Sequence, residues 1–454
     1  MRVETRVLGV NPDGEAQFLA IAHFFDAQGA LTRVLANSDL AWRPSRGVAQ
    51  WQNRMRFGEP AAIVSVDTEG PVTLRVHPNA PVLPDAMVQT DTRTWNVPRV
   101  TAAAVGPYLA QIGWFPRSSS VALVERRDAR GRWVALATLP AGSSTYGDAS
   151  AKASQTYHYR IARSGMPAAL ATVHMPAALP ATSVSSVSGV GMWLFFSTNP
   201  SDDIYYANLD PQRIVEQAVD ARIRFVELRV AYGAMWQITE EAKPVVDAIV
   251  DGLRAHGIAT IAWIVPRATA FDDLHAAVEA GNYTTAGGNR FAGLAVDAER
   301  GEEFLSSGRD AIADYYHLLR AAVGPRYVLI ATVEDPAMEH LTEADYPYRE
   351  IAQNATVLQP MSYWRMMASS STTPESVRTL LRTSYETLQS YAGSAVPISI
   401  GGQTSADGAH GRPPADEIAA SLSEAQALGA VGECFFAWED TSPAQWTAIR
   451  KGAW

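Results

Sequence analysis

The sequence predicts a multidomain protein in which two N-terminal all-β sandwiches are followed by an α/β domain, a (β/α)8 or TIM barrel. Three observations support this prediction. The chain has 454 residues, about three times the usual size of one domain. Its first part, up to about residue 165, alternates apolar and polar residues in short runs, as half-buried strands do. From about residue 190, strongly apolar runs alternate with amphipathic stretches, which is typical of strand–helix repeats.

The composition excludes several classes of protein. Hydrophobic residues make up 47% and charged residues 19%, which is enough apolar surface to build folded cores. The net charge of −10 argues against a nucleic-acid partner, because binding to phosphates needs a basic face. We expect no membrane span, since no apolar run reaches about 18–20 residues. The one cysteine, Cys434, allows neither an intrachain disulfide nor a cysteine-based zinc site, and the N-terminus lacks the pattern of a signal peptide.

The first predicted sandwich covers residues 1–95. Its alternating runs are 16–25, 61–66 and 72–76, and turn signals at 11–14 and 69–71 separate them. Short alternating strands at this spacing indicate a β-sandwich. The segment resembles the bacterial Ig-like modules that are attached to many secreted hydrolases.

The second predicted sandwich covers residues 97–165. Its clearest runs are 121–127, 131–139 and 156–161, and they resemble the second half of a fibronectin type III domain. In that family a tyrosine near the final strands hydrogen-bonds to the backbone upstream, and the resemblance gives this place to Tyr157 or Tyr159. Residues 166–190 are rich in Ala, Pro, Ser and Gly, so we expect them to form a linker.

The barrel is predicted over residues 191–454. The apolar runs are 192–197, 225–230, 260–265, 291–296, 327–333, 356–361, 396–400 and 433–438. They are almost continuously apolar, as strands are when both faces of a parallel sheet are buried. Eight strand–helix repeats in this length are typical of a (β/α)8 barrel, and a doubly wound open sheet is the alternative.

Helix start and stop signals lie between these runs. Helices are expected at 210–220, 240–256, 302–323, 374–391 and 414–428. The first has Asp210 as its N-cap and Pro211 at its first position, and the others end at or next to glycine. No GxGxxG or Walker A sequence is present, so we expect no nucleotide cofactor.

The candidate site follows from the barrel, because active sites of such barrels lie at the carboxyl ends of the strands. The polar and aromatic residues at those ends include Glu227, Arg229, Trp263, Asp297, Glu299, Glu334, Tyr363, Trp364, Gln403, Trp438 and Glu439. Aromatic rings stack on the C–H faces of sugars, and carboxyl groups supply acid–base chemistry. Together these residue types indicate a carbohydrate site.

Asp297 and Glu299 form the most specific pair. Residues i and i+2 of a strand point the same way, and their Cα atoms lie about 6–7 Å apart. Two neighbouring carboxyl groups in a partly apolar environment repel each other, so one keeps its proton at neutral pH and can act as an acid. The alternative is a pair of solvated carboxylates at a strand end. No HxxxH, HExxH or GxSxG spacing occurs, so we expect neither a metal site nor a serine nucleophile.

Three short motifs resemble glycoside hydrolase family 18, the chitinase-like family. Residues 291–299 read FAGLAVDAE and match the end of that family's DGxDxDxE signature. Met361-Ser362-Tyr363 is similar to its M-x-Y motif, and Trp438 is similar to its strand-eight tryptophan. The resemblance implies that Glu299 is the general acid, that Asp297 and Tyr363 bind an N-acetyl group of the substrate, and that Trp438 forms the floor of the sugar subsite.

The sequence also departs from that family. Ala292 and Ala295 stand at the first two Asp positions of the signature, and Trp364 stands where an Asp normally follows the tyrosine. A D-x-E pair on the fourth strand also occurs in family 25 lysozyme-like barrels, which are the second choice. The resemblance is therefore to glycosidase barrels as a group.

These observations predict hydrolysis of a glycosidic bond in a polysaccharide or glycoconjugate, with Glu299 as the acid, Asp297 as its partner and Tyr363 beside them. The predicted substrate-binding residues are Trp438, Trp364, Trp263, Glu227, Gln403 and Glu334. The rival prediction is a barrel that binds glycan without cleaving it, or a structural part of a cell-surface or phage-tail assembly. We expect an extracellular or cell-surface protein, with a virion or the cytoplasm as alternatives.

Overall fold

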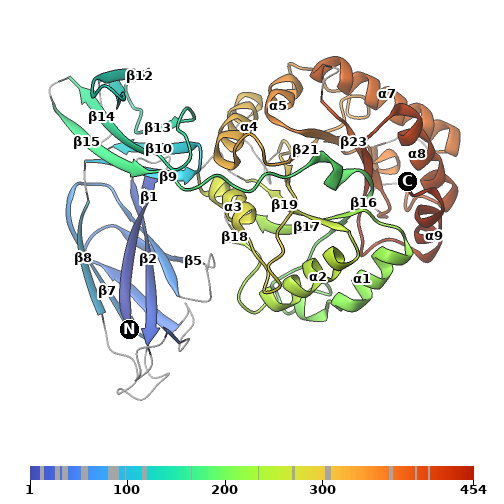
Figure 1. The fold of residues 1–454 in the computed structure, drawn as a ribbon, viewed down its shortest axis with the longest axis horizontal. Helices are drawn as coiled ribbons and strands as arrows, with labels where there is room; N and C mark the ends of the chain where they lie inside the picture. Colours follow the sequence, from blue (N-terminus) through green and yellow to red (C-terminus); the bar gives the residue numbers. More distant parts are fainter. Residues whose placement is uncertain are drawn as a thin grey trace. The chain divides into compact units, whose positions relative to one another are not determined.

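The structure is a computed structural model that describes residues 1–10, 15–25, 31–32, 39–52, 60–79, 91–97, 99–114, 120–164, 166–233, 235–267, 271–301, 308–367, 372–393, 396–406 and 410–454. The chain folds into two compact units, Met1–Ala178 and Leu179–Trp454 (Figure 1). Both predicted sandwiches lie in the first unit and the barrel forms the second. Three separate domains are therefore not confirmed.

The first half of the N-terminal unit consists of two antiparallel sheets. One contains β1 (Arg2–Val10), β2 (Ala16–Phe25), β6 (Ala61–Val66) and β5 (Val48–Gln52), with β3 (Leu31–Thr32) beside β2; the other contains β4 (Leu40–Pro44), β7 (Gly70–Pro78) and β8 (Asp91–Val97). Buried and exposed residues alternate along β7, as the sequence predicts. Phe18 and Val64 of one sheet share a core with Val72 and Leu74 of the other, so the two sheets form one sandwich.

Two further antiparallel sheets complete the N-terminal unit. One contains β9 (Val100–Gly106), β10 (Leu109–Trp114) and β13 (Thr145–Asp148); the other contains β12 (Trp133–Leu139), β11 (Ala122–Arg127), β14 (Thr156–Arg163) and β15 (Met166–His174). Trp114, Val124, Tyr159 and Ile161 lie in their common core.

The tyrosine hydrogen bond expected in the second sandwich is present. The Tyr157 hydroxyl accepts a hydrogen bond of 3.0 Å from the backbone N–H of Lys152, five residues upstream, whereas Tyr159 donates to the Asp148 side chain. The predicted linker at 166–190 is wrong in its first part, because Met166–His174 is strand β15, which pairs with β14. Membership of the two sandwiches in the Ig-like and fibronectin type III classes stays a prediction.

The second unit is a closed barrel of eight parallel strands. In chain order they are β16 (Gly189–Leu194), β17 (Phe225–Tyr232), β19 (Ala259–Val265), β20 (Leu294–Asp297), β21 (Leu329–Val333), β22 (Val357–Pro360), β23 (Ser399–Gln403) and β24 (Gly432–Phe436). Strand β16 pairs with both β17 and β24, and bridges from Leu358 to Ile398 and from Met361 to Gly401 join β22 to β23. The ring is thereby closed, so the doubly wound open sheet is wrong.

Helices surround the barrel (Figure 1). They are α1 (Pro211–Asp220), α2 (Lys243–Ala255), α3 (Phe271–Asn282), α4 (Arg309–Val323), α5 (Tyr348–Asn354), α6 (Trp364–Met367), α7 (Pro374–Ala392), α8 (Ala415–Leu428) and α9 (Pro443–Gly452). Asp210 caps α1 as predicted, by accepting hydrogen bonds from the backbone of Gln212 and Arg213. The part of the predicted helix at 302–307 lies outside the described residues. None of the helices in the described ranges is both long and apolar enough to cross a membrane.

The segment before β16 belongs to the barrel and not to a linker. The side-chain oxygen of Thr182 accepts a 2.6 Å hydrogen bond from the backbone of Val328, and the Thr182 N–H donates to the carbonyl of Arg326. Leu179 is buried against α3, where a Cβ at Gly281 would lie 2.4 Å from the leucine side chain. Val187, in a short 3-10 helix (Val184–Val187), lies in the barrel core.

Candidate active site

Asp297 is the last residue of β20, and Glu299 follows it by two residues. The backbone around them is held from outside the barrel. The buried hydroxyl of Tyr316 on α4 donates to the carbonyl of Val296, and that of Tyr346 donates to the carbonyl of Ala298, at 3.0 and 2.7 Å. Both carbonyls that flank Asp297 are therefore paired, which holds the backbone at the end of β20 in place.

The two carboxyl groups hold protons more tightly than usual. Burial raises the pKa of Asp297 to about 7, although Glu299, Trp263 and the charge of Arg229 act in the opposite direction. Burial raises the pKa of Glu299 to about 9, and the charges of Asp297 and Glu334 add to the effect. A pKa of about 9 favours the protonated, neutral form of Glu299 at pH 7.

Asp297 also offers an open hydrogen-bonding position. The residue is only 7% exposed, and its Oδ1 atom is buried without a hydrogen-bond partner among the described residues. A buried polar atom without a partner is costly, so it often marks a place where a ligand or water binds.

A cluster of five aromatic rings, which we call the aromatic floor, lies beside the pair. It consists of Trp193, Phe195, Trp263, Tyr363 and Phe436. Ring centroids are 6.4 Å apart for Trp193 and Trp263, and 5.8 Å apart for Tyr363 and Phe436. Burial and the charges of Asp297 and Glu299 raise the pKa of Tyr363, which places its hydroxyl in the field of both carboxyl groups. Such a floor can stack against the apolar face of a sugar.

Arg229 brings a positive charge to the same region. Its guanidinium carbon lies 4.9 Å from the ring centre of Phe195 and 5.6 Å from that of Trp263, and its Nε donates to Gln237 at 3.1 Å. Its charge lowers the pKa of Asp297. No role was predicted for Arg229, although it stands two residues after Glu227, on the same face of β17.

Two of the predicted substrate-binding residues are structural anchors. Trp364 is fully buried, and its indole nitrogen donates to Glu417 of α8 at 3.0 Å. Gln403 is buried too, and its side-chain oxygen accepts hydrogen bonds from the backbone of Arg365 and Met366 at the start of α6. Both predictions are wrong, because these side chains hold the loop that carries Tyr363 and do not face the floor.

The prediction that Trp438 forms the floor of the sugar subsite is also wrong. Its ring packs against Trp446 of α9, with centroids 4.9 Å apart, and Phe436 occupies the place in the aromatic floor that was predicted for it. Phe436 is two residues after Cys434, which lies in the barrel core, so alternation along β24 turns it inward. The same alternation, counted from the sequence, would have predicted Phe436 in place of Trp438.

Glu227 and Glu334 do not offer free carboxylates to a substrate. Glu227 is fully buried inside the barrel and accepts a 2.9 Å hydrogen bond from Gln359. Glu334 forms an ion pair with Arg300 and accepts a hydrogen bond from the Arg300 backbone, and it thus secures the segment after β20. Of the predicted site residues, the structure brings together Asp297, Glu299, Tyr363 and Trp263.

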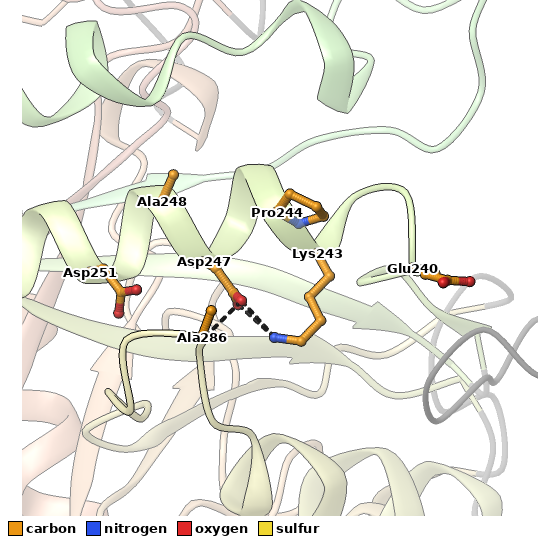
Figure 2. A pocket seen from close by; sticks show the side chains of 7 residues that line it. All are labelled: Glu240, Lys243, Pro244, Asp247, Ala248, Asp251 and Ala286. Atoms are coloured by element: carbon orange, nitrogen blue, oxygen red, sulfur yellow. Dashed lines mark hydrogen bonds and ion pairs between the residues drawn. The ribbon is translucent and has the colours of Figure 1, made fainter. Parts of the chain in front are cut away.

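A separate hollow lies between α2 and the 283–289 loop. Figure 2 shows Lys243 reaching the carboxylate of Asp247, with Asp251 further along the helix. Asp247 also accepts from the backbone of Ala286, and Asp251 accepts from Asn289 at 2.8 Å. These carboxylates are used in holding the loop, so the hollow supplies no reactive group. Within the described ranges, no group of three or more His, Cys, Asp or Glu residues is arranged to hold a metal ion.

Comparisons with known proteins find similar solved structures at low sequence identity. No protein-family profile and no curated sequence matches the chain. A chitinase from Chromobacterium violaceum is 15% identical over 58% of this chain and 98% of its own, with a TM-score of 0.40. The spore cortex-lytic enzyme SleL of Bacillus megaterium is 10% identical over 62% and 76%, with a TM-score of 0.39. The C-terminal domain of a putative chitinase from Desulfitobacterium hafniense is 11% identical over 59% and 99%, with a TM-score of 0.42. Likeness at this level carries no information on activity.

Proposed function

We propose that the barrel is a glycoside hydrolase that cleaves a glycosidic bond in a polysaccharide or glycoconjugate. The proposal depends on one observation above all: Glu299, which keeps its proton at neutral pH, stands beside Asp297 at the mouth of a barrel with an aromatic floor. An acid, a second carboxyl group and a stacking surface are the parts that glycoside hydrolysis needs. A polysaccharide substrate would place the protein outside the cell or at its surface.

In this mechanism Glu299 donates its proton to the glycosidic oxygen while the bond between that oxygen and the anomeric carbon breaks. Positive charge develops on the sugar, and ionised Asp297 stabilises it. Water then adds to the anomeric carbon and gives one proton back to Glu299, so the enzyme is restored and one water is consumed. Through the family 18 resemblance, Asp297 and Tyr363 are proposed to bind an N-acetyl group, which makes N-acetylated glycans the first substrates to test.

The test is a screen of chitin oligosaccharides, peptidoglycan and other glycans for newly released reducing ends. Glu299→Gln keeps the size and polarity of the side chain but removes the transferable proton. Turnover should fall at least about 100-fold, because general acid catalysis contributes roughly that much or more. Glycan binding and the melting temperature should stay close to those of the unchanged protein.

Glu386→Gln is the matched control, because Glu386 is an exposed residue of α7 outside the barrel mouth. It should leave the rate unchanged. A Glu299→Gln protein that hydrolyses glycan at nearly the original rate would contradict the assignment of the acid.

A second candidate function is glycan binding without cleavage. Alanine stands at positions 292 and 295, where the family 18 signature has Asp, so neither position supplies a carboxyl group. Trp364 is turned away, toward Glu417. Glycan binding that survives Glu299→Gln, with no reducing ends released by the unchanged protein, would favour this function.

A further inference from the structure

A second carboxyl group is sealed inside the barrel, and the proposed mechanism does not use it. Glu227 on β17 is 0% exposed, and its Oε1 atom accepts the 2.9 Å hydrogen bond from Gln359 on β22. Three strands separate β17 from β22 in either direction around the barrel, so this hydrogen bond crosses the interior. A substrate at the mouth cannot reach Glu227.

The orientation of Gln359 determines which oxygen of Glu227 can carry a proton. The Thr332 hydroxyl donates to the side-chain oxygen of Gln359 at 3.1 Å, which turns the amide nitrogen toward Glu227 Oε1. The other oxygen, Oε2, is buried and has no hydrogen-bond partner among the described residues. A proton on Glu227 would therefore reside on Oε2.

The hydrogen-bonded series of Glu227, Gln359 and Thr332 ends beside Asp297. Thr332 on β21 is the residue paired with Asp297 across the two strands, and the Oδ1 atom of Asp297 is, like Oε2 of Glu227, buried without a hydrogen-bond partner among the described residues. Two carboxyl groups are thus enclosed in one interior of low polarity, where charges interact strongly. Burial raises the pKa of Glu227 to about 7, and the charge of Asp297 raises it further, while the hydrogen bond from Gln359 acts in the opposite direction.

The other titratable groups around the two carboxyls are few. Cys434 on β24 and Tyr363 after β22 face Glu227. Asp297 is faced by Glu299, by Arg229 on β17, by Glu334 after β21, and by the tyrosines at 316, 346 and 363. Arg229 and Glu334 carry opposite charges, and Glu334 is paired with Arg300. Two further acids adjoin these neighbours: Glu439 faces Arg229, and Glu339 faces Glu299.

We infer that Glu227 is a positioning residue, a buried carboxylic acid whose protonation controls the ionisation of Asp297 from inside the barrel. The interaction is mutual: each carboxyl group, once ionised, opposes the ionisation of the other. Loss of the Glu227 proton therefore makes Asp297 harder to ionise and changes the charge next to Glu299. Its effect on turnover rests on the proposed hydrolase function, but the electrostatic link does not.

The link can be measured without any substrate. The full chain is labelled with 13C at the carboxyl carbons of Asp and Glu, and the Asp297 signal is identified by its loss in Asp297→Asn. Glu227→Gln keeps an oxygen to accept the hydrogen bond from Gln359 but cannot ionise. It should lower the titration midpoint of Asp297 by about 0.5–1 pH unit, since one neighbouring negative charge is removed.

Glu433→Gln is the matched control, because Glu433 is another fully buried glutamate of the barrel but lies near Ser421 of α8. It should leave the Asp297 midpoint in place. Thr332→Val, which removes the hydroxyl that orients Gln359 and keeps the shape, should shift the midpoint in the same direction as Glu227→Gln. If Glu227→Gln does not fold, the Asp297 midpoint in Thr332→Val tests the inference instead.

An unchanged Asp297 midpoint in Glu227→Gln, or an equal shift in Glu433→Gln, would overturn the inference. If a glycan substrate is found, the acidic side of the pH–rate profile of Glu227→Gln should move to lower pH by a similar amount. If no glycan is cleaved, the hydrolase proposal fails while the titration still decides the role of Glu227.

Discussion

Burial determines the proton affinity of individual side chains in this barrel more than neighbouring charge does. Burial is the largest cause of the raised pKa of Glu227, Asp297, Glu299 and Glu433. Of these four residues, Asp297 and Glu299 lie at the end of β20, and the pKa of Glu299, about 9, is raised to the highest value. The same physical effect therefore favours the protonated form both at the barrel mouth and inside the barrel.

Glu433 gives a direct test of this effect on stability. Burial raises its pKa from the usual 4.5 to about 8, so the folded protein binds this proton more tightly than the unfolded chain does. Its contribution to stability is therefore present below pH 4.5 and is lost as the pH rises toward 8. The loss is about 1.4 kcal/mol per pH unit at most. Glu433→Gln should flatten the fall in unfolding free energy over this range, measured by urea denaturation at several pH values. An equal slope in both proteins would contradict the prediction.

Phe436 and Trp438 provide a second contrast between single residues. Phe436 belongs to the aromatic floor, whereas Trp438 packs against Trp446 of α9. Phe436→Ala should weaken glycan binding by about 1–3 kcal/mol, as loss of an aromatic anchor does. Trp438→Ala should lower the melting temperature and leave the affinity of the folded protein nearly unchanged. Calorimetric titration with the same oligosaccharide checks both predictions. A loss of affinity in Trp438→Ala but not in Phe436→Ala would show that Trp438, and not Phe436, contacts the sugar.

At the scale of elements, the loop after β22 shows how buried anchors position one half-buried side chain, that of Tyr363. Ser362 donates to Asp335 at 2.6 Å, and Trp364 donates to Glu417. Tyr363 lies between these two fixed neighbours and reaches the aromatic floor. Its position is thus determined by residues that never touch a substrate.

Glu417 carries most of this anchoring. It is 1% exposed and accepts hydrogen bonds from the Trp364 indole, the Thr372 hydroxyl, and the Nε and Nη2 atoms of Arg365. Glu417→Gln should cost about 3–5 kcal/mol of unfolding free energy, because it removes one partner of a buried ion pair. Glu375→Gln breaks the exposed pair with Arg378 and should stay within about 0.5 kcal/mol. Thermal and urea denaturation measure both, and a similar small effect at both sites would contradict the anchoring role.

The sequence predicts the elements better than it predicts the directions of side chains beyond their ends. All eight barrel strands overlap the predicted apolar runs, although β16 and β23 are each displaced by three residues, because both faces of a parallel strand are buried. The shared direction of the Asp297 and Glu299 side chains follows from simple alternation along β20. The directions of the Tyr363 and Trp364 side chains do not, because α6 begins there and turns successive side chains by about 100°. The sequence also provides no indication that Glu227 is hydrogen-bonded inside the barrel, because its partner Gln359 is 132 residues away in the chain.

At the scale of the whole molecule, the boundary between the two units lies later than the end of the second predicted sandwich and earlier than the predicted start of the barrel. Low-complexity sequence at 166–190 suggests a linker, yet its first part completes a sheet and its last part packs on the barrel. Strand β15 is rich in alanine, which is a weak strand former. The strand is therefore identified by its pairing with β14 and not by its sequence. The boundary follows from tertiary contacts that local composition does not encode.

This boundary predicts how the chain can be divided. A fragment of residues 179–454 should fold alone and keep any activity on small soluble glycans, because every residue of the candidate site lies within it. A fragment of residues 189–454 lacks Leu179, the two hydrogen bonds of Thr182 and the core residue Val187. Loss of a buried leucine costs about 2–5 kcal/mol and each hydrogen bond about 1 kcal/mol, so the shorter fragment should be clearly less stable.

Circular dichroism during heating and urea denaturation compare the two fragments with the full chain. Equal stability of both fragments would show that residues 179–188 are not part of the barrel. A folded but inactive 179–454 fragment, next to an active full chain, would show that the N-terminal unit contributes to the site. Because Leu179 fills the space that Gly281 leaves open on α3, Gly281→Ala in the longer fragment should destabilise it. In the shorter fragment the same substitution should have a much smaller effect, since the leucine that it would displace is absent.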